Sequence, residues 1–192
     1  MDEVLHALGI KGRASLEEVA AVLGSAPSAT EQALHELELA GLVIERPAGR
    51  RPGWMLSPAG REAYANQSWE SVSSDARARL IAEYKSFLQI NTRAKMVCSV
   101  WQTTSDEQRR AELFMELDEI HDRVEPVLSR CGEIVARFGR YGARLAEALE
   151  RAQDDPRYVV SPSVDSFHTI WFECHEDFLV TLGRSRHEEG SW

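Results

Sequence analysis

Apolar residues recur with helical spacing in the first part of the chain. Between Ser15 and Gly24 they return every three or four positions, and Glu18 follows Ser15 at the spacing of a capping box. This pattern predicts a short helix over residues 16–23. Gly24 can take the left-handed conformation that ends a helix, so a tight turn is expected there.

A second helix and two strands are expected after that turn. Pro27 fixes the backbone at the start of the helix, Ser28 or Thr30 is predicted to cap it, and Gly41 ends it. Two short apolar runs follow, and the segment between them is rich in Pro, Gly and Arg. We therefore expect strands near 42–44 and 54–56 joined by a loop: helix, turn, helix and hairpin in order.

The second half of the chain has the pattern of long, packed helices. One helix is predicted over about residues 75–102, with a seam spaced alternately four and three residues apart: Leu80, Tyr84, Phe87, Asn91, Ala94, Cys98 and Trp101. The next apolar run continues through Pro126, which is expected to kink that helix or split it in two. A third helix is predicted to carry the apolar residues of 134–149.

The last part of the chain has an unusually wide apolar face. Residues 157–162 follow an Asp-Pro pair and are expected to be extended, and Ser161 with Pro162 is a start signal for the last helix. On that helix, His168 and His175 border a face of aromatic residues.

Length and composition allow one large or two small domains. The chain has 192 residues, of which 43% are apolar, enough to build two cores. A polar, Ser-rich stretch separates the two patterns. The sequence therefore predicts a mainly α protein with an N-terminal domain over 1–66, a linker over 67–75 and an all-helical domain over 76–192.

Three segments carry a family resemblance: ALHELE at 33–38, AGLV at 40–43 and LSPAGRE at 56–62. With them, residues 15–66 resemble the winged helix-turn-helix transcriptional regulators of the MarR and PadR type. The resemblance implies three helices plus a two-stranded wing, and double-stranded DNA as partner. In that family the second helix of the motif enters the major groove and the wing touches the phosphate backbone. The candidate DNA-binding residues that this implies are Ser28, Glu31, Gln32, His35, Arg46, Arg50 and Arg51.

Charge departs from that family pattern. Residues 28–40 contain no Lys or Arg, residues 1–66 carry six basic against nine acidic side chains, and the whole chain has a net charge of −9. Most DNA-binding domains are basic, and duplex affinity comes largely from neutralised phosphates, so two copies would be needed for useful affinity. The alternative is a winged-helix protein-interaction module or regulatory subunit that does not bind DNA.

A polar residue interrupts the seam of the long helix. Asn91 either fixes the register of a helical dimer, pairs inside the bundle or hydrogen-bonds a ligand. The candidate effector-binding residues are Asn91, Trp101, Phe167, His168, Trp171 and His175. A metal site on the two histidines would need further ligands from Cys174, Glu173 or His121, so histidines bonded to neighbours are favoured and no metal or cofactor is predicted.

The C-terminal half carries a second resemblance. The segments HTIWFECHED at 168–177 and FLQIN at 87–91 resemble actinobacterial regulators that occur alongside pyruvate phosphate dikinase-like proteins. The order of domains is that of a one-component regulator. We expect a homodimer, formed through the long helix, that sets two DNA-contacting helices roughly 34 Å apart on a palindromic operator. A small-molecule effector would act by favouring one spacing over another.

Other classes of protein are disfavoured by what the sequence lacks. It has no Gly-rich phosphate loop, nucleophile elbow or HExxH motif, so no enzyme is predicted. It shows neither a membrane-spanning segment nor a signal-peptide pattern, which predicts a cytoplasmic protein. The three cysteines are odd in number and widely spaced, which favours buried thiols over a disulfide framework.

Overall fold

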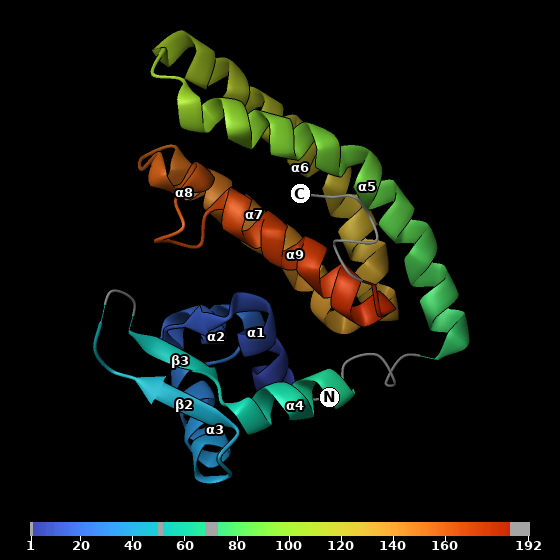
Figure 1. Cartoon of the computed structure of the whole chain (residues 1–192). Helices are drawn as coiled ribbons and strands as arrows, with labels where there is room; N and C mark the ends of the chain where they lie inside the picture. Colours follow the sequence, from blue (N-terminus) through green and yellow to red (C-terminus); the bar gives the residue numbers. More distant parts are fainter. Residues whose placement is uncertain (1, 50–51, 68–72, 185–192) are drawn as a thin grey trace. The chain divides into compact units, whose positions relative to one another are not determined.

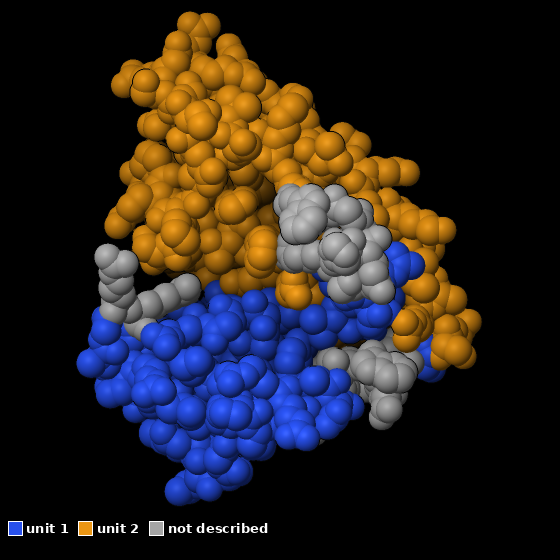
Figure 2. Space-filling view, viewed as in Figure 1, with its two compact units in different colours: residues 1–73, 179–192 blue, residues 74–178 orange. Residues whose placement is uncertain are grey.

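The computed structural model describes residues 2–49, 52–67 and 73–184 (Figure 1). The chain is mainly helical, with a small three-stranded antiparallel sheet. It divides into two compact units, Met1–Ser73 with Leu179–Trp192 and Ser74–Phe178, which Figure 2 colours separately. None of the helices in the described ranges combines the length and the apolar composition that crossing a bilayer requires.

The first unit combines short helices with the sheet. In chain order its elements are α1 (Glu3–Lys11), β1 (Arg13–Ala14), α2 (Leu16–Leu23), α3 (Pro27–Leu39), β2 (Val43–Arg46), β3 (Gly53–Leu56) and α4 (Pro58–Gln67). The strand order is β1-β3-β2, and Val43 pairs with Leu56 while Arg46 pairs with Gly53, so β2 and β3 form a hairpin (Figure 1). Both predicted strands are present. Strand β1 was not predicted, because two residues are too short to show an alternating pattern.

The start and end of α2 follow the local signals of the sequence. The Glu18 amide donates to the Ser15 hydroxyl (3.2 Å) and the Ser15 amide donates to the Glu18 carboxylate (2.7 Å), so the predicted capping box is confirmed. Gly24 ends the helix with φ of 60°, as expected for a left-handed cap.

Helix α3 begins without the side-chain cap that we predicted from Ser28 or Thr30. Ala26 occupies the N-cap position, where no side chain caps the helix. Pro27 has no N–H to satisfy and a fixed φ, so it starts the helix by itself. Thr30 lies one turn further on, where its hydroxyl donates to the Ala26 carbonyl (3.2 Å) and bonds the Ser25 hydroxyl (2.7 Å).

One core joins the helices and strands of the first unit. Its buried apolar residues are Val4, Leu5, Ala7, Leu8, Ala14, Val19, Leu34, Val43, Trp54 and Leu56. Helix α4 approaches the end of the hairpin closely at Gly60, where an added Cβ would lie 1.8 Å from the Leu42 carbonyl oxygen. Only glycine permits this approach, which explains Gly60 in the 56–62 segment.

The second unit is helical. Its elements are α5 (Ser74–Thr103), α6 (Glu107–Ile134), the short 3₁₀ helix η1 (Ala136–Phe138), α7 (Gly139–Ala152), α8 (Arg157–Val160) and α9 (Phe167–Leu182), of which the residues up to Phe178 belong to this unit. Arg93 of α5 pairs with Glu116 of α6, and Glu83 pairs with Arg130, so these two helices lie side by side and antiparallel (Figure 1).

The seam of α5 is covered inside its own chain. All seven predicted seam residues, from Leu80 to Trp101, are buried. The heptad spacing correctly indicated a helix packed along its length, but its partners are helices of the same chain. A homodimer that used this seam would have to displace them.

The helix break expected at Pro126 is absent, and so is the extended segment expected after Pro156. Helix α6 runs through Pro126 as one helix. The proline removes the hydrogen bond to the Asp122 carbonyl, but both residues are exposed, so water can satisfy that oxygen. Residues 157–162 are not extended either, because α8 forms there: the Asp155 carboxylate accepts the Arg157 amide (3.0 Å) and starts a helical turn.

The last helix begins at Phe167 rather than at Ser161. The Ser166 hydroxyl accepts the Thr169 amide (3.2 Å), which is the bond of an N-cap. The Ser161 hydroxyl bonds the Ser163 hydroxyl (2.8 Å), so it is occupied in a local turn. The predicted start at Ser161 and Pro162 was therefore wrong, and the sequence analysis missed Ser166.

We predict that the capping box of α2 stabilises the first unit and that Ser28 does not. Replacing Ser15 by Ala removes the side-chain acceptor of the Glu18 amide and should lower the free energy of unfolding by about 1 kcal/mol. Ser28→Ala is the matched control and should change it by less than about 0.5 kcal/mol. Urea unfolding of both variants measures the difference, and equal losses would contradict the capping assignment.

Candidate functional site

The predicted DNA-contacting residues of α3 lie on its solvent-facing side. Ser28, Gln32, His35 and Leu39 are spaced four, three and four residues apart, so they share one helix face, and all four are exposed. Leu39 is 90% exposed, which is unusual for a leucine. The opposite face carries Leu34, which is fully buried.

Acidic side chains flank this face. Glu31, Glu36 and Glu38 are exposed, and α3 contains no Lys or Arg. The Gln32 amide donates to the Glu36 carboxylate (2.9 Å), and Nδ1 of His35 lies 3.5 Å from the Glu38 carboxylate. A partner that takes hydrogen bonds from Gln32 or His35 must therefore compete with these carboxylates.

His35 also contacts the hairpin. Its ring lies edge-on to Trp54 of β3, with 5.3 Å between the ring centroids. Trp54 is buried, and it pairs with Glu45 of β2 and Ala14 of β1. This contact joins the outer face of α3 to strand β3 of the hairpin. It therefore fixes His35 relative to the sheet.

The predicted wing arginines are only in part described. Arg46 ends β2, is exposed and pairs with Gly53 across the hairpin. Arg50 and Arg51 lie outside the described residues. The hairpin thus presents at least one cation at the base of its loop, in contrast to the acidic surface of α3.

The polar residue of the α5 seam is paired inside the bundle. The Trp171 indole N–H donates to Oδ1 of Asn91 at 2.8 Å, and both residues are buried. Of the three roles that the sequence left open for Asn91, the structure shows this internal one. The side chain that was expected to bind an effector accepts a hydrogen bond from another candidate of the same set.

The aromatic face of α9 packs against α5. Trp171 stacks between Phe87 and Phe167, with ring centroids 5.0 and 5.6 Å away. His175 shares a hydrogen bond of 2.9 Å with the hydroxyl of Tyr84. These residues form a continuous buried cluster, which is the packing that the wide apolar face of α9 requires.

Two effector candidates differ from the rest of the set. His168 is half-buried, and burial lowers the pKa of its imidazole. Trp101 lies ten residues beyond Asn91 on α5, about 15 Å along the helix, where the Arg110 guanidinium covers its ring at 5.6 Å. The structure therefore brings Asn91, Phe167, Trp171 and His175 together in one buried cluster, where they contact one another or neighbouring aromatic residues. Trp101 lies outside this cluster.

Sequence reasoning missed a set of buried ion pairs in the second unit. Arg144 of α7 donates to Asp165 (2.9 Å) and to Glu173 of α9 (2.8 Å). Asp177 accepts from Arg137 (3.0 Å) and from the Tyr141 hydroxyl (3.1 Å). These partners are far apart in the sequence, and no local pattern distinguishes them from surface charges. In the described ranges no three His, Cys, Asp or Glu side chains group as metal ligands.

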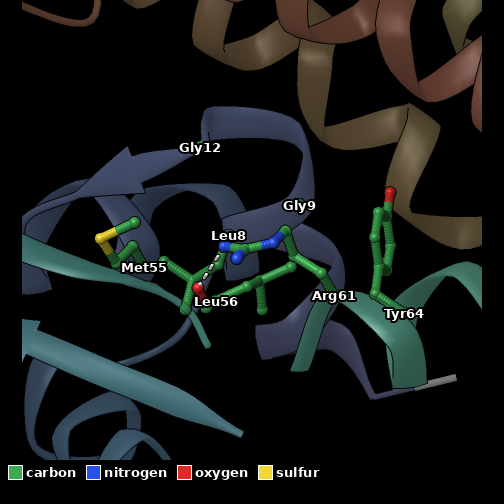
Figure 3. A pocket seen from close by; sticks show the side chains of 7 residues that line it. All are labelled: Leu8, Gly9, Gly12, Met55, Leu56, Arg61 and Tyr64. Atoms are coloured by element: carbon green, nitrogen blue, oxygen red, sulfur yellow. Dashed lines mark hydrogen bonds between the residues drawn. The ribbon is translucent and has the colours of Figure 1, made fainter. Parts of the chain in front are cut away.

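Sequence reasoning also missed a pocket of about 410 Å³ in the first unit (Figure 3). Its lining residues come from α1, the α1–β1 turn, β3 and α4: Leu8, Gly9, Gly12, Met55, Leu56, Arg61 and Tyr64. The one available signal was Arg61, which lies in the family-like 56–62 segment. Nothing in the sequence connected that residue with α1.

We predict that the bond between Asn91 and Trp171 stabilises the second unit. Asn91→Leu leaves the buried indole N–H without an acceptor and should lower the free energy of unfolding by about 2 kcal/mol. In a double-mutant cycle, Asn91→Leu with Trp171→Phe should be about 1 kcal/mol less destabilised than the sum of the single variants. Strict additivity in denaturant unfolding would show that the bond contributes nothing.

We predict that the three thiols do not react in the folded protein. Burial raises the pKa of Cys98 and of Cys131 to about 12, and raises that of Cys174 well above its ordinary value. At pH 8 a thiol with a pKa of about 12 is ionised in about one molecule in ten thousand, against about one in four for an exposed thiol. A chromogenic disulfide reagent should label no cysteine within minutes in buffer and all three in guanidinium. Rapid labelling in buffer would contradict the burial.

Comparison with known proteins gave no match: no protein-family model, no curated protein and no solved structure matched the chain.

Proposed function

We propose that the chain is a cytoplasmic transcriptional regulator whose first unit is a winged helix that binds double-stranded DNA. The observation that supports this most is the order of elements: α1, β1, α2, α3, β2 and β3, with β3 between β1 and β2 in the sheet. A helix-turn-helix followed by an antiparallel hairpin that pairs with a short strand after the first helix is the arrangement of winged-helix domains.

The geometry of the turn and of α3 supports the same proposal. Gly24 in the left-handed conformation joins two short helices tightly, as in a helix-turn-helix. The outer face of α3 carries Gln32 and His35, side chains that can donate and accept hydrogen bonds at base edges in the major groove. Arg46 at the base of the hairpin is placed to contact phosphate.

A second candidate function is supported by the charge of α3. Its outer face combines the highly exposed Leu39 with Glu31, Glu36 and Glu38, and it lacks Lys and Arg. Carboxylates repel the phosphate backbone, whereas an apolar centre with a charged rim is typical of protein interfaces. On this alternative, the winged helix binds a protein with a basic rim and an apolar pocket for Leu39.

Regulation and dimerisation are further parts of the proposal. A palindromic operator requires two copies, and since the α5 seam is covered, the second copy must contact another surface. An effector at the aromatic cluster must replace the bond between Asn91 and Trp171, so it would act by opening the contact of α5 with α9. It can shift the equilibrium only by its difference in affinity for the two states.

We predict salt-dependent, sequence-selective binding to the promoter of the chain's own gene. Fluorescence anisotropy at two salt concentrations, with a scrambled duplex as control, measures it. Arg46→Ala should weaken binding to both duplexes equally and reduce the salt slope by about 1. Gln32→Ala should instead reduce the preference for the promoter sequence by about tenfold.

The control variant is Arg123→Ala, which removes an exposed arginine of α6 in the second unit and should leave both affinities unchanged. An equal loss on both duplexes from Gln32→Ala would contradict the placement of α3 in the groove. Promoter binding no tighter than that to the scrambled duplex at either salt concentration would reject the DNA proposal and favour the protein-binding alternative.

A further inference from the structure

The pocket of the first unit is formed by three elements that the core packing holds in place. Leu8 of α1 and Leu56 of β3 are buried in the core and form the floor. Tyr64 of α4 lies against α1 at Gly9, where an added Cβ would fall 2.3 Å from the tyrosine ring. Gly9 therefore lets α4 lie close enough to α1 for Tyr64 to serve as one wall.

The rim of the pocket is open at Gly12. This residue ends α1 with φ of 73°, and an added Cβ there would meet no atom within 4 Å. The volume of about 410 Å³ falls in the range of small-molecule sites, roughly 300–1,000 Å³. Apart from Arg61 and the Tyr64 hydroxyl, the lining side chains are apolar or absent.

The single charged residue that lines the pocket is a cation with donors to spare. One Nη of Arg61 donates to the Leu56 carbonyl at 3.0 Å, which fixes the guanidinium at the floor, and Figure 3 shows the side chain extending toward Leu56. Among the residues that the structure describes, no carboxylate pairs with Arg61. A guanidinium has five N–H donors, so several remain for a ligand.

A second guanidinium contacts the lining residue Met55, although it does not itself line the pocket. Arg13 of β1 is the cross-strand partner of Met55, and its Nη donates to the methionine sulfur at 3.2 Å. Arg61 is exposed, so its attraction for an anion comes from charge-assisted hydrogen bonds rather than from the exclusion of water. The pocket thus combines one lining guanidinium with an otherwise largely apolar surface.

From this combination we propose that the pocket binds a small monocarboxylate with a compact aromatic or branched aliphatic body. The carboxylate accepts hydrogen bonds from Arg61, and the apolar body covers Leu8, Met55 and Leu56. This site is distinct from the surface of α3 and from the aromatic cluster of α9. Its occupation does not depend on DNA, so it is tested independently of the proposed function.

The experiment uses 4-fluorobenzoate as probe and 4-fluorobenzamide as its uncharged isostere. Fluorine NMR titration of the full chain should give saturable binding of the benzoate, at least about tenfold tighter than that of the benzamide, because a charged hydrogen-bonded pair is lost in the amide. Arg61→Met should abolish this preference and leave weak, similar binding of both probes. The matched control, Arg46→Met, changes an exposed arginine of the same unit outside the pocket and should keep it.

A second measurement locates the probe even if Arg61→Met fails to fold. In the unmodified protein, benzoate should shift the backbone amide signals of Gly9, Gly12 and Met55 and leave those of α3 unchanged. The proposal is overturned if both probes bind equally to the unmodified protein, if Arg61→Met retains the preference, if Arg46→Met loses it as fully, or if the shifted amides lie outside the pocket.

Discussion

Helix α9 is buried on most of its circumference, and the second unit depends on the partners that its buried polar side chains find there. Trp171 donates to Asn91, His175 bonds Tyr84, and Glu173 and Asp177 accept from arginines. Leaving the charge of Glu173 or Asp177 unpaired would cost several kcal/mol. The bundle is thus specified as much by polar complementarity between α5, α7 and α9 as by its apolar area.

Several elements of the first unit could be predicted from short-range sequence signals. The capping box of Ser15 and Glu18, the left-handed Gly24 and the hairpin strands depend on residues within a few positions of one another, and each is present. The seam of α5 was equally predictable, since helical spacing identifies a buried face. What covers that face depends on tertiary packing, and in this chain α9 supplies part of the cover, as the contacts of Phe87 and Asn91 with Trp171 show.

Two of the differences have a physical cause outside the local sequence. Whether Pro126 breaks α6 depends on access to water, and which acid meets Arg144 depends on residues remote in sequence. The candidate sites divide in the same way: the outer face of α3 follows from helical spacing, whereas the pocket at Arg61 requires α1, β3 and α4 to meet. A local sequence pattern does not indicate which distant elements pack together.

The long sequence separation between α5 and α9 bears on how the protein forms during synthesis. Tyr84 and Phe87 leave the ribosome about 85 to 90 residues before Trp171 and His175, the residues that pack on them. Because chains fold progressively from the N-terminus, α5 and α6 can pair first, with an aromatic face still open. Until α9 has been synthesised, that face is an exposed hydrophobic surface. We expect chaperones to bind nascent or prematurely terminated chains there.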